Sequence, residues 1–142
     1  MRLFGVILLA GLLSVFAGLA VTIAGSAVVP CSSDPAGCGM GEAYRIFAIP
    51  AYVLIGMIAF GISAPGQGRE RTVRITMKVL MLVPIILIAF GLAADGSAGK
   101  TTKGSDILEA LQLVVPFWAV VFTQWFVVRD FLRRREQERA PA

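Results

Sequence analysis

An apolar run from position 3 to position 29 contains no charged side chain, and this feature most strongly restricts what the chain can fold into. An α-helix needs about 20 predominantly apolar residues to cross the hydrocarbon core of a bilayer. Three further apolar runs follow at 46–63, 75–94 and 107–128. The sequence therefore predicts an all-α integral membrane protein, with a four-helix transmembrane bundle over residues 1–132 and a basic tail at 133–142.

Composition favours the same fold class and argues against many kinds of catalytic and metal-binding site. Of the 142 residues, 57% are hydrophobic and 15% are charged, against roughly 25% charged residues in a soluble domain. The chain has no histidine, which removes the commonest general base and the commonest metal ligand. We recognise no catalytic, cofactor-binding or metal-binding motif and expect that the protein is not an enzyme.

The basic residues predict the orientation in the membrane. Lysine and arginine accumulate on the cytoplasmic side of membrane proteins. The loops at 30–45 and 95–106 contain only Arg45, Lys100 and Lys103, whereas the other ten basic residues fall at the N-terminus, in the middle loop and its flank, and in the tail. We therefore expect both termini in the cytoplasm and these two loops outside.

The first apolar run also has features of a secretory signal peptide. The Ala-Gly-Ser-Ala stretch at 24–27 resembles a cleavage region. The run is nevertheless much longer than the 7–15 apolar residues of a signal peptide. We expect a retained transmembrane helix.

One face of the first predicted helix is built from small residues. Glycines recur every seven residues, and a second row of small residues recurs every four and shares Gly18 with the first. Small residues allow helix backbones to approach closely within a membrane. The face is either a seam against the protein's own helices, which we favour, or a docking surface for a partner, and it comprises Gly11, Ser14, Gly18, Thr22 and Gly25.

The other three predicted helices each contain one proline, at positions 50, 84 and 116. Proline removes a backbone donor and tends to kink a helix. Such kinks either fit the helices together, which we favour, or shape a cavity. In the fourth helix Gln112, Thr123 and Gln124 are polar; they either bond to neighbouring helices or line a polar path.

Both cysteines, Cys31 and Cys38, lie in the first predicted outer loop. Cysteines that are exposed outside the cytoplasm usually pair, so we expect a structural disulfide between them. Four-helix membrane thiol oxidoreductases also carry cysteines outside the membrane. This sequence departs from them because it lacks a Cys-x-x-Cys pair and a second cysteine pair.

Several basic residues are predicted to anchor the helix ends at anionic lipids on the cytoplasmic face. The tail continues the fourth helix, and Asp130 is placed to pair with Arg134 one turn later. A cytoplasmic docking tail is the alternative, and acidic residues within the tail argue against nucleic-acid binding. The predicted anchors are Arg74, Lys78, Arg129, Arg133, Arg134 and Arg135.

Three functions remain open from the sequence. The first is an accessory or structural subunit packed against a larger membrane complex, which the small-residue face favours. The second is a small oligomeric transporter or channel, which the prolines and glutamines favour. The third is a membrane thiol oxidoreductase. Because the chain is rich in alanine, glycine and arginine and its outer loop suits an oxidising side, we expect a bacterial inner membrane.

Overall fold

A computed structural model describes residues 2–28, 35–65, 69–97 and 104–139 of the protein. This part of the chain forms four α-helices: α1 (Arg2–Val28), α2 (Pro35–Ser63), α3 (Arg69–Ser97) and α4 (Gly104–Arg139). Each helix contains a segment that is long and apolar enough to cross a membrane: Leu3–Gly25, Ile46–Ser63, Arg69–Gly91 and Val114–Glu138. The predicted helix count is confirmed, and the structure is that of a candidate multi-pass membrane protein.

The helices run further than the predicted spans, although the second candidate span, Ile46–Ser63, agrees with the predicted one. Helix α2 begins at Pro35 rather than near residue 46, so the second half of the predicted loop 30–45 is helical. Proline suits the first position of a helix, where its missing N–H group would have no partner. Helix α4 continues through the tail to Arg139, so no break separates a tail from the bundle at residue 133.

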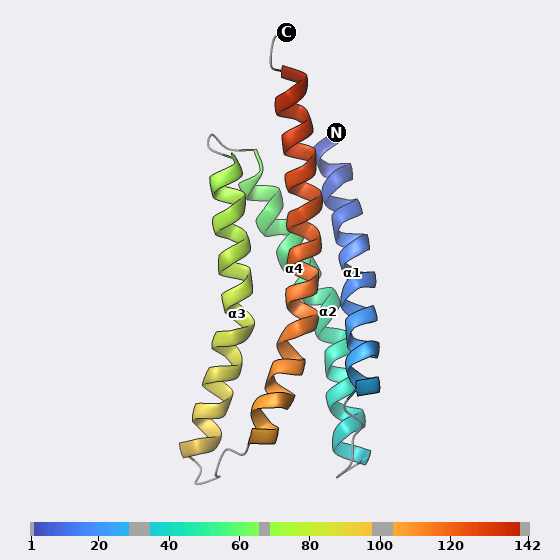
Figure 1. Ribbon diagram of the computed structural model, residues 1–142, viewed down its shortest axis with the longest axis vertical. Helices are drawn as coiled ribbons and strands as arrows, with labels where there is room; N and C mark the ends of the chain where they lie inside the picture. Colours follow the sequence, from blue (N-terminus) through green and yellow to red (C-terminus); the bar gives the residue numbers. More distant parts are fainter. Residues whose placement is uncertain (1, 29–34, 66–68, 98–103, 140–142) are drawn as a thin grey trace.

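Helix α4 is the centre of the bundle. It packs against each of the other three helices, and α2 also contacts α1 and α3, whereas α1 and α3 do not touch within the described residues. In Figure 1, α1 begins and α4 ends at the same end of the bundle, and the last turns of α4 extend beyond the other helices.

The core is apolar and narrow, and the outside is apolar as well. Buried residues from α2, α3 and α4 form one cluster that includes Ile49, Val53, Phe60, Val73, Val120, Val121 and Val128. Large hydrophobic side chains such as Phe4, Phe47, Ile62 and Phe90 point outward and are more than two-thirds exposed. Such an exterior suits a lipid environment, because soluble proteins rarely expose large apolar patches.

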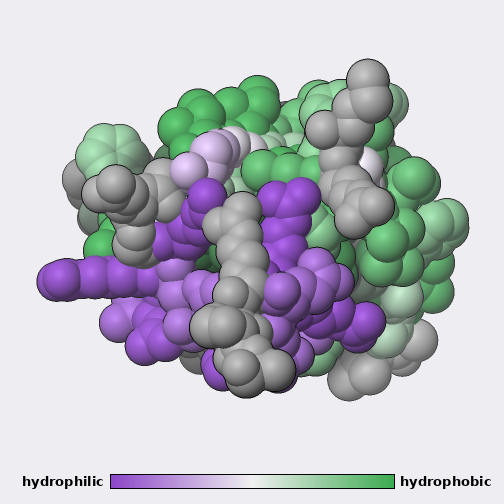
Figure 2. Space-filling model, turned by 90° about the horizontal axis from the view of Figure 1, so that it is seen from above, coloured by the Kyte–Doolittle hydropathy of each residue, from purple (hydrophilic) through white to green (hydrophobic). Residues whose placement is uncertain are grey.

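Hydrophilic side chains gather at the end where α4 finishes. Figure 2 looks onto this end, and the hydrophilic surface lies on the side of α3 and α4, while the side of α1 is hydrophobic. We call this end the charged end.

Candidate functional site

The small-residue face of α1 lies inside the bundle. A Cβ atom on Gly18 would come within 2.9 Å of Val120 Cγ2 on α4, and one on Gly11 would overlap Met57 Sδ on α2. Ser14 and Thr22 are buried, and their hydroxyls donate to the carbonyls of Gly11 and Gly18, at 2.7 and 2.8 Å. The protein's own helices therefore occupy this part of the face. The exception is Gly25, where a Cβ atom would meet nothing within 4 Å.

Gln124 joins three helices in the middle of the bundle. Its side chain is fully buried. Nε2 donates to Ser14 Oγ on α1 and to the Val53 carbonyl on α2, both at 3.1 Å. Because both partners accept, they fix which end of the amide is nitrogen. This amide is the polar link of the α1–α2–α4 interface.

The other end of the Gln124 amide faces Gly56 on α2. Oε1 is buried and receives no hydrogen bond from the described residues. A Cβ atom at position 56 would overlap this oxygen. Glycine is therefore the residue that allows the amide to fit between α2 and α4.

The candidate polar path is described only in part. Thr123 donates to the Ala119 carbonyl of its own helix at 2.8 Å, and Gln124 uses its donors inside the bundle as described above. The side chain of Gln112 lies outside the described residues, as do Cys31 and the side chain of Cys38. The disulfide and the polar path remain predictions.

Side chains of α2 and α4 donate hydrogen bonds to backbone carbonyls of α3 beside its proline. Pro84 has no N–H group, so the carbonyl of Leu80 lacks its usual donor four residues later. The Tyr52 hydroxyl on α2 donates to this carbonyl. On the other side, Trp118 Nε1 of α4 donates to the adjacent carbonyl of Met81 at 3.1 Å. Helix α3 runs through Pro84 without interruption.

Aromatic packing supports the same junction. The ring of Tyr52 meets that of Phe117 edge to face, with centroids 5.0 Å apart. Pro84 is itself buried. In this bundle the proline of α3 therefore provides a place where α2 and α4 attach.

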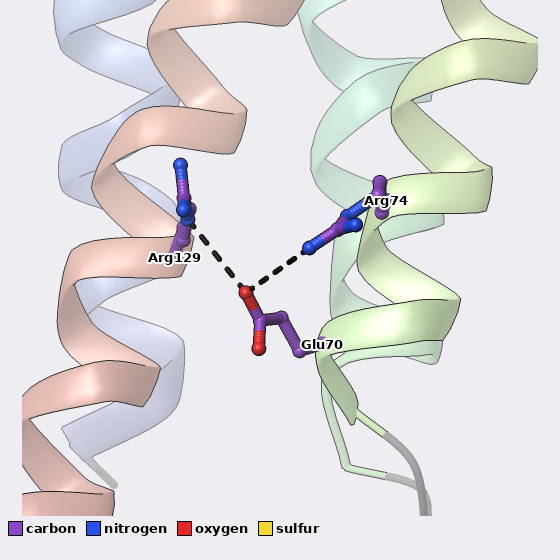
Figure 3. Close-up of polar contacts among 3 residues, drawn as sticks. All are labelled: Glu70, Arg74 and Arg129. Carbon is purple, nitrogen blue, oxygen red and sulfur yellow. Dashed lines mark hydrogen bonds and ion pairs between the residues drawn. The ribbon is translucent and has the colours of Figure 1, made fainter.

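At the charged end, an acidic side chain lies between two arginines (Figure 3). Glu70 Oε1 on α3 is 3.4 Å from Arg74 Nη2 on the same helix and 3.9 Å from Arg129 Nε on α4. The guanidinium of Arg129 also stacks over the Trp125 ring, 4.8 Å from its centroid. These residues line a recess between α3 and α4.

The remaining predicted anchors lie at the surface. The predicted pair of Asp130 and Arg134 is confirmed, with 2.9 Å between Oδ2 and Nε. Arg135 lies over the ring of Phe131 at 4.7 Å. Lys78 and Arg133 are exposed.

Sequence reasoning missed four of the participants: Glu70, Gly56, and Tyr52 and Trp118 as hydrogen-bond donors. Glu70 carries a usable signal, because a carboxylate four residues before Arg74 in a basic stretch is placed for a helical ion pair. Gly56, Tyr52 and Trp118 carry none, since their roles depend on which neighbouring helix they face.

Within the described residues, no group of three or more potential ligands is placed to hold a metal ion. None of the family models, curated proteins and solved structures compared with this chain matches it.

Proposed function

We propose that this protein is a multi-pass protein of the bacterial inner membrane that acts as an accessory or structural subunit of a larger membrane complex. The observation that carries the proposal is the use of Gln124. Nε2 of this buried amide donates one hydrogen bond to α1 and one to α2, so it joins both helices to α4. Its donor capacity thus serves assembly of the bundle, as expected of a scaffold.

The proposed orientation places the charged end in the cytoplasm. Arginines at the start of α3 and along the end of α4 lie at this end, beside the start of α1. The positive-inside rule assigns such an end to the cytoplasm. This arrangement supports a cytoplasmic location for both termini.

Purification in a mild detergent tests the subunit proposal. The tagged full-length chain is isolated through two chromatographic steps, and the partners are identified and quantified by mass spectrometry. We expect a membrane complex of fixed stoichiometry that re-forms from its separated components.

Two glycine variants serve as controls. Gly18→Leu disturbs the seam of the bundle and should lose the partner, whereas Gly5→Leu should retain it, because a Cβ atom at Gly5 meets nothing within 4 Å. A homogeneous oligomer of this chain alone would overturn the subunit proposal.

A small oligomeric channel or transporter is the second candidate. The favouring observation is Gln124 Oε1, a buried acceptor that receives no hydrogen bond from the described residues, because such an atom is available to a passing water or cation. Solute flux into proteoliposomes tests this candidate. Flux that Gln124→Leu abolishes would favour it over the subunit role. The thiol-oxidoreductase hypothesis rests on Cys31 and Cys38, outside the described side chains.

A further inference from the structure

The recess between α3 and α4 at the charged end has the composition of an anion site. Its arginines carry three positive charges and its glutamates two negative charges, so its formal charge is +1. Apolar side chains complete the walls. The polar and aromatic lining residues are Glu70, Arg74, Trp125, Arg129, Arg133 and Glu136.

The ion pairs present leave donors of the recess unused. Strong pairs between a guanidinium and a carboxylate have donor–acceptor distances of about 2.7–2.9 Å. The two pairs of Glu70 measure 3.4 and 3.9 Å. Arg129 Nε is buried and makes no hydrogen bond with the described residues. A guanidinium has five N–H donors, so an added oxygen ligand would improve the bonding of Arg129.

Apolar surface lies beside the recess and is linked to it by Trp125. Trp125 holds the Arg129 guanidinium on its face, and its ring packs edge to face on Phe122, with centroids 5.4 Å apart. Phe122 is about half exposed on the outer surface of α4. A ligand that fits both the basic recess and this apolar surface has an anionic group and an attached hydrocarbon chain.

We propose that this recess binds one anionic phospholipid by its phosphodiester headgroup. Arg129, Arg74 and Arg133 would hold the phosphate, and an acyl chain would follow Phe122. A singly charged phosphodiester matches the formal charge of +1. Basic pockets between transmembrane helices are known to take such headgroups. The inference requires that the bundle lies in a bilayer, as proposed above, but it does not require a partner subunit.

Lipid binding to matched arginine variants tests the site. Native mass spectrometry of the full-length protein in detergent measures the affinity for phosphatidylglycerol and for phosphatidylcholine. We expect preferential binding of phosphatidylglycerol, and Arg129→Gln should weaken it about fivefold, the effect of roughly one basic residue at an anionic surface.

Arg134→Gln is the control for Arg129→Gln. It removes the same charge from the same end of α4, but Arg134 is largely exposed and pairs with Asp130. We expect it to change the affinity less than twofold. Equal losses in the two variants would show attraction by net charge alone and would overturn the site.

A second variant keeps the test decisive if Arg129→Gln unfolds the protein. Glu70→Gln removes the carboxylate that competes for Arg74 and Arg129, and its two ion pairs are long and partly exposed, so they contribute little to stability. We expect tighter binding of phosphatidylglycerol, by about fivefold. Unchanged or weaker binding would contradict the proposal.

Inorganic phosphate distinguishes the source of the anion. Added at millimolar concentration, it should leave phosphatidylglycerol bound, because it cannot use the apolar surface at Phe122. Displacement of the lipid by phosphate would assign the recess to a free phosphate instead. Retention of partner subunits by a lipid-free Arg129→Gln variant would leave the subunit proposal intact.

Discussion

Helices α1 and α3 lie on opposite sides of α4 and are attached by different means. Helix α1 approaches closely: a Cβ atom at Gly18 would press on the branched side chains of Val120 and Ile49, and one at Gly11 would displace the flexible end of Met57. Helix α3 is more exposed than α1. In its most apolar segment 17% of the residues are buried, against 33% in that of α1. It is attached by side-chain hydrogen bonds to the carbonyls of Leu80 and Met81.

The difference shows two ways to join apolar helices whose outward-facing side chains are as apolar as those in the core. Close backbone approach gains dispersion contacts over a long seam. A proline instead leaves one backbone carbonyl without its usual N–H donor. An unbonded carbonyl is costly where no water can reach it, as in a bilayer core, so a donor from a neighbouring helix stabilises the contact between the two helices. The first way depends on shape along the whole helix, and the second depends on one or two atoms.

The largest effect is expected when the α1 seam is filled. Gly18→Leu would force a side chain against Val120 and Ile49, which are β-branched and stiff. We expect the free energy of unfolding to fall by about 3 kcal/mol, measured by unfolding in mixed micelles containing sodium dodecyl sulfate. Gly5→Leu is the control on the same helix, and an equal loss there would show that the seam is not the cause.

A smaller effect is expected at the Gln124 link. Gly56→Ala places a methyl group against Oε1 and should displace the amide from Ser14 and Val53. We expect a loss of about 2 kcal/mol. Gly91→Ala on α3 is the control, since its Cβ atom would meet nothing within 4 Å. In a Gln124→Ala background the Gly56→Ala cost should largely vanish, and a persistent cost would place the clash elsewhere.

The α3 attachment gives the sharpest comparison through a double-mutant cycle. Tyr52→Phe leaves the Leu80 carbonyl without its donor, and we expect a loss of about 1 kcal/mol. Pro84→Ala restores a backbone N–H group that can bond the same carbonyl. Tyr52→Phe should then cost close to nothing. No cost in either background would mean that Tyr52 stabilises the bundle by ring packing alone, and an equal cost in both would mean that its hydroxyl does not act through the carbonyl that Pro84 leaves unbonded.

The smallest effect on stability is expected at the charged end. The Glu70 side chain is 48% exposed, and its two ion pairs are long. Exposed pairs of this kind contribute about 0–1 kcal/mol and are screened by salt. Glu70→Gln should therefore change the free energy of unfolding by less than about 0.5 kcal/mol at 150 mM salt. A larger loss would mean that this pair, like the seam, is part of what holds α3 to α4.

The limits of prediction follow from particular residues. The span of α1 was predictable because its charge-free run is long, and Gly11 and Gly18 showed which face would pack. The early start of α2 was not, because the glycines after Pro35 are typical of a loop yet cost only about 1 kcal/mol each in a helix. For Gln124 the sequence predicted a helix contact or a polar path but could not name Ser14 and Val53 as partners.

The sequence by itself determined that this chain forms four long apolar helices, because helix formation in lipid depends on local composition and length. Only the tertiary structure decided that Gln124 joins three helices, that Tyr52 and Trp118 serve the carbonyls near Pro84, and that Glu70 faces Arg129. The reason is physical. Outward-facing and bundle-facing residues of these helices are both apolar, so the sequence does not record how each helix is rotated about its axis. Partners far apart in the chain are fixed only when the helices pack.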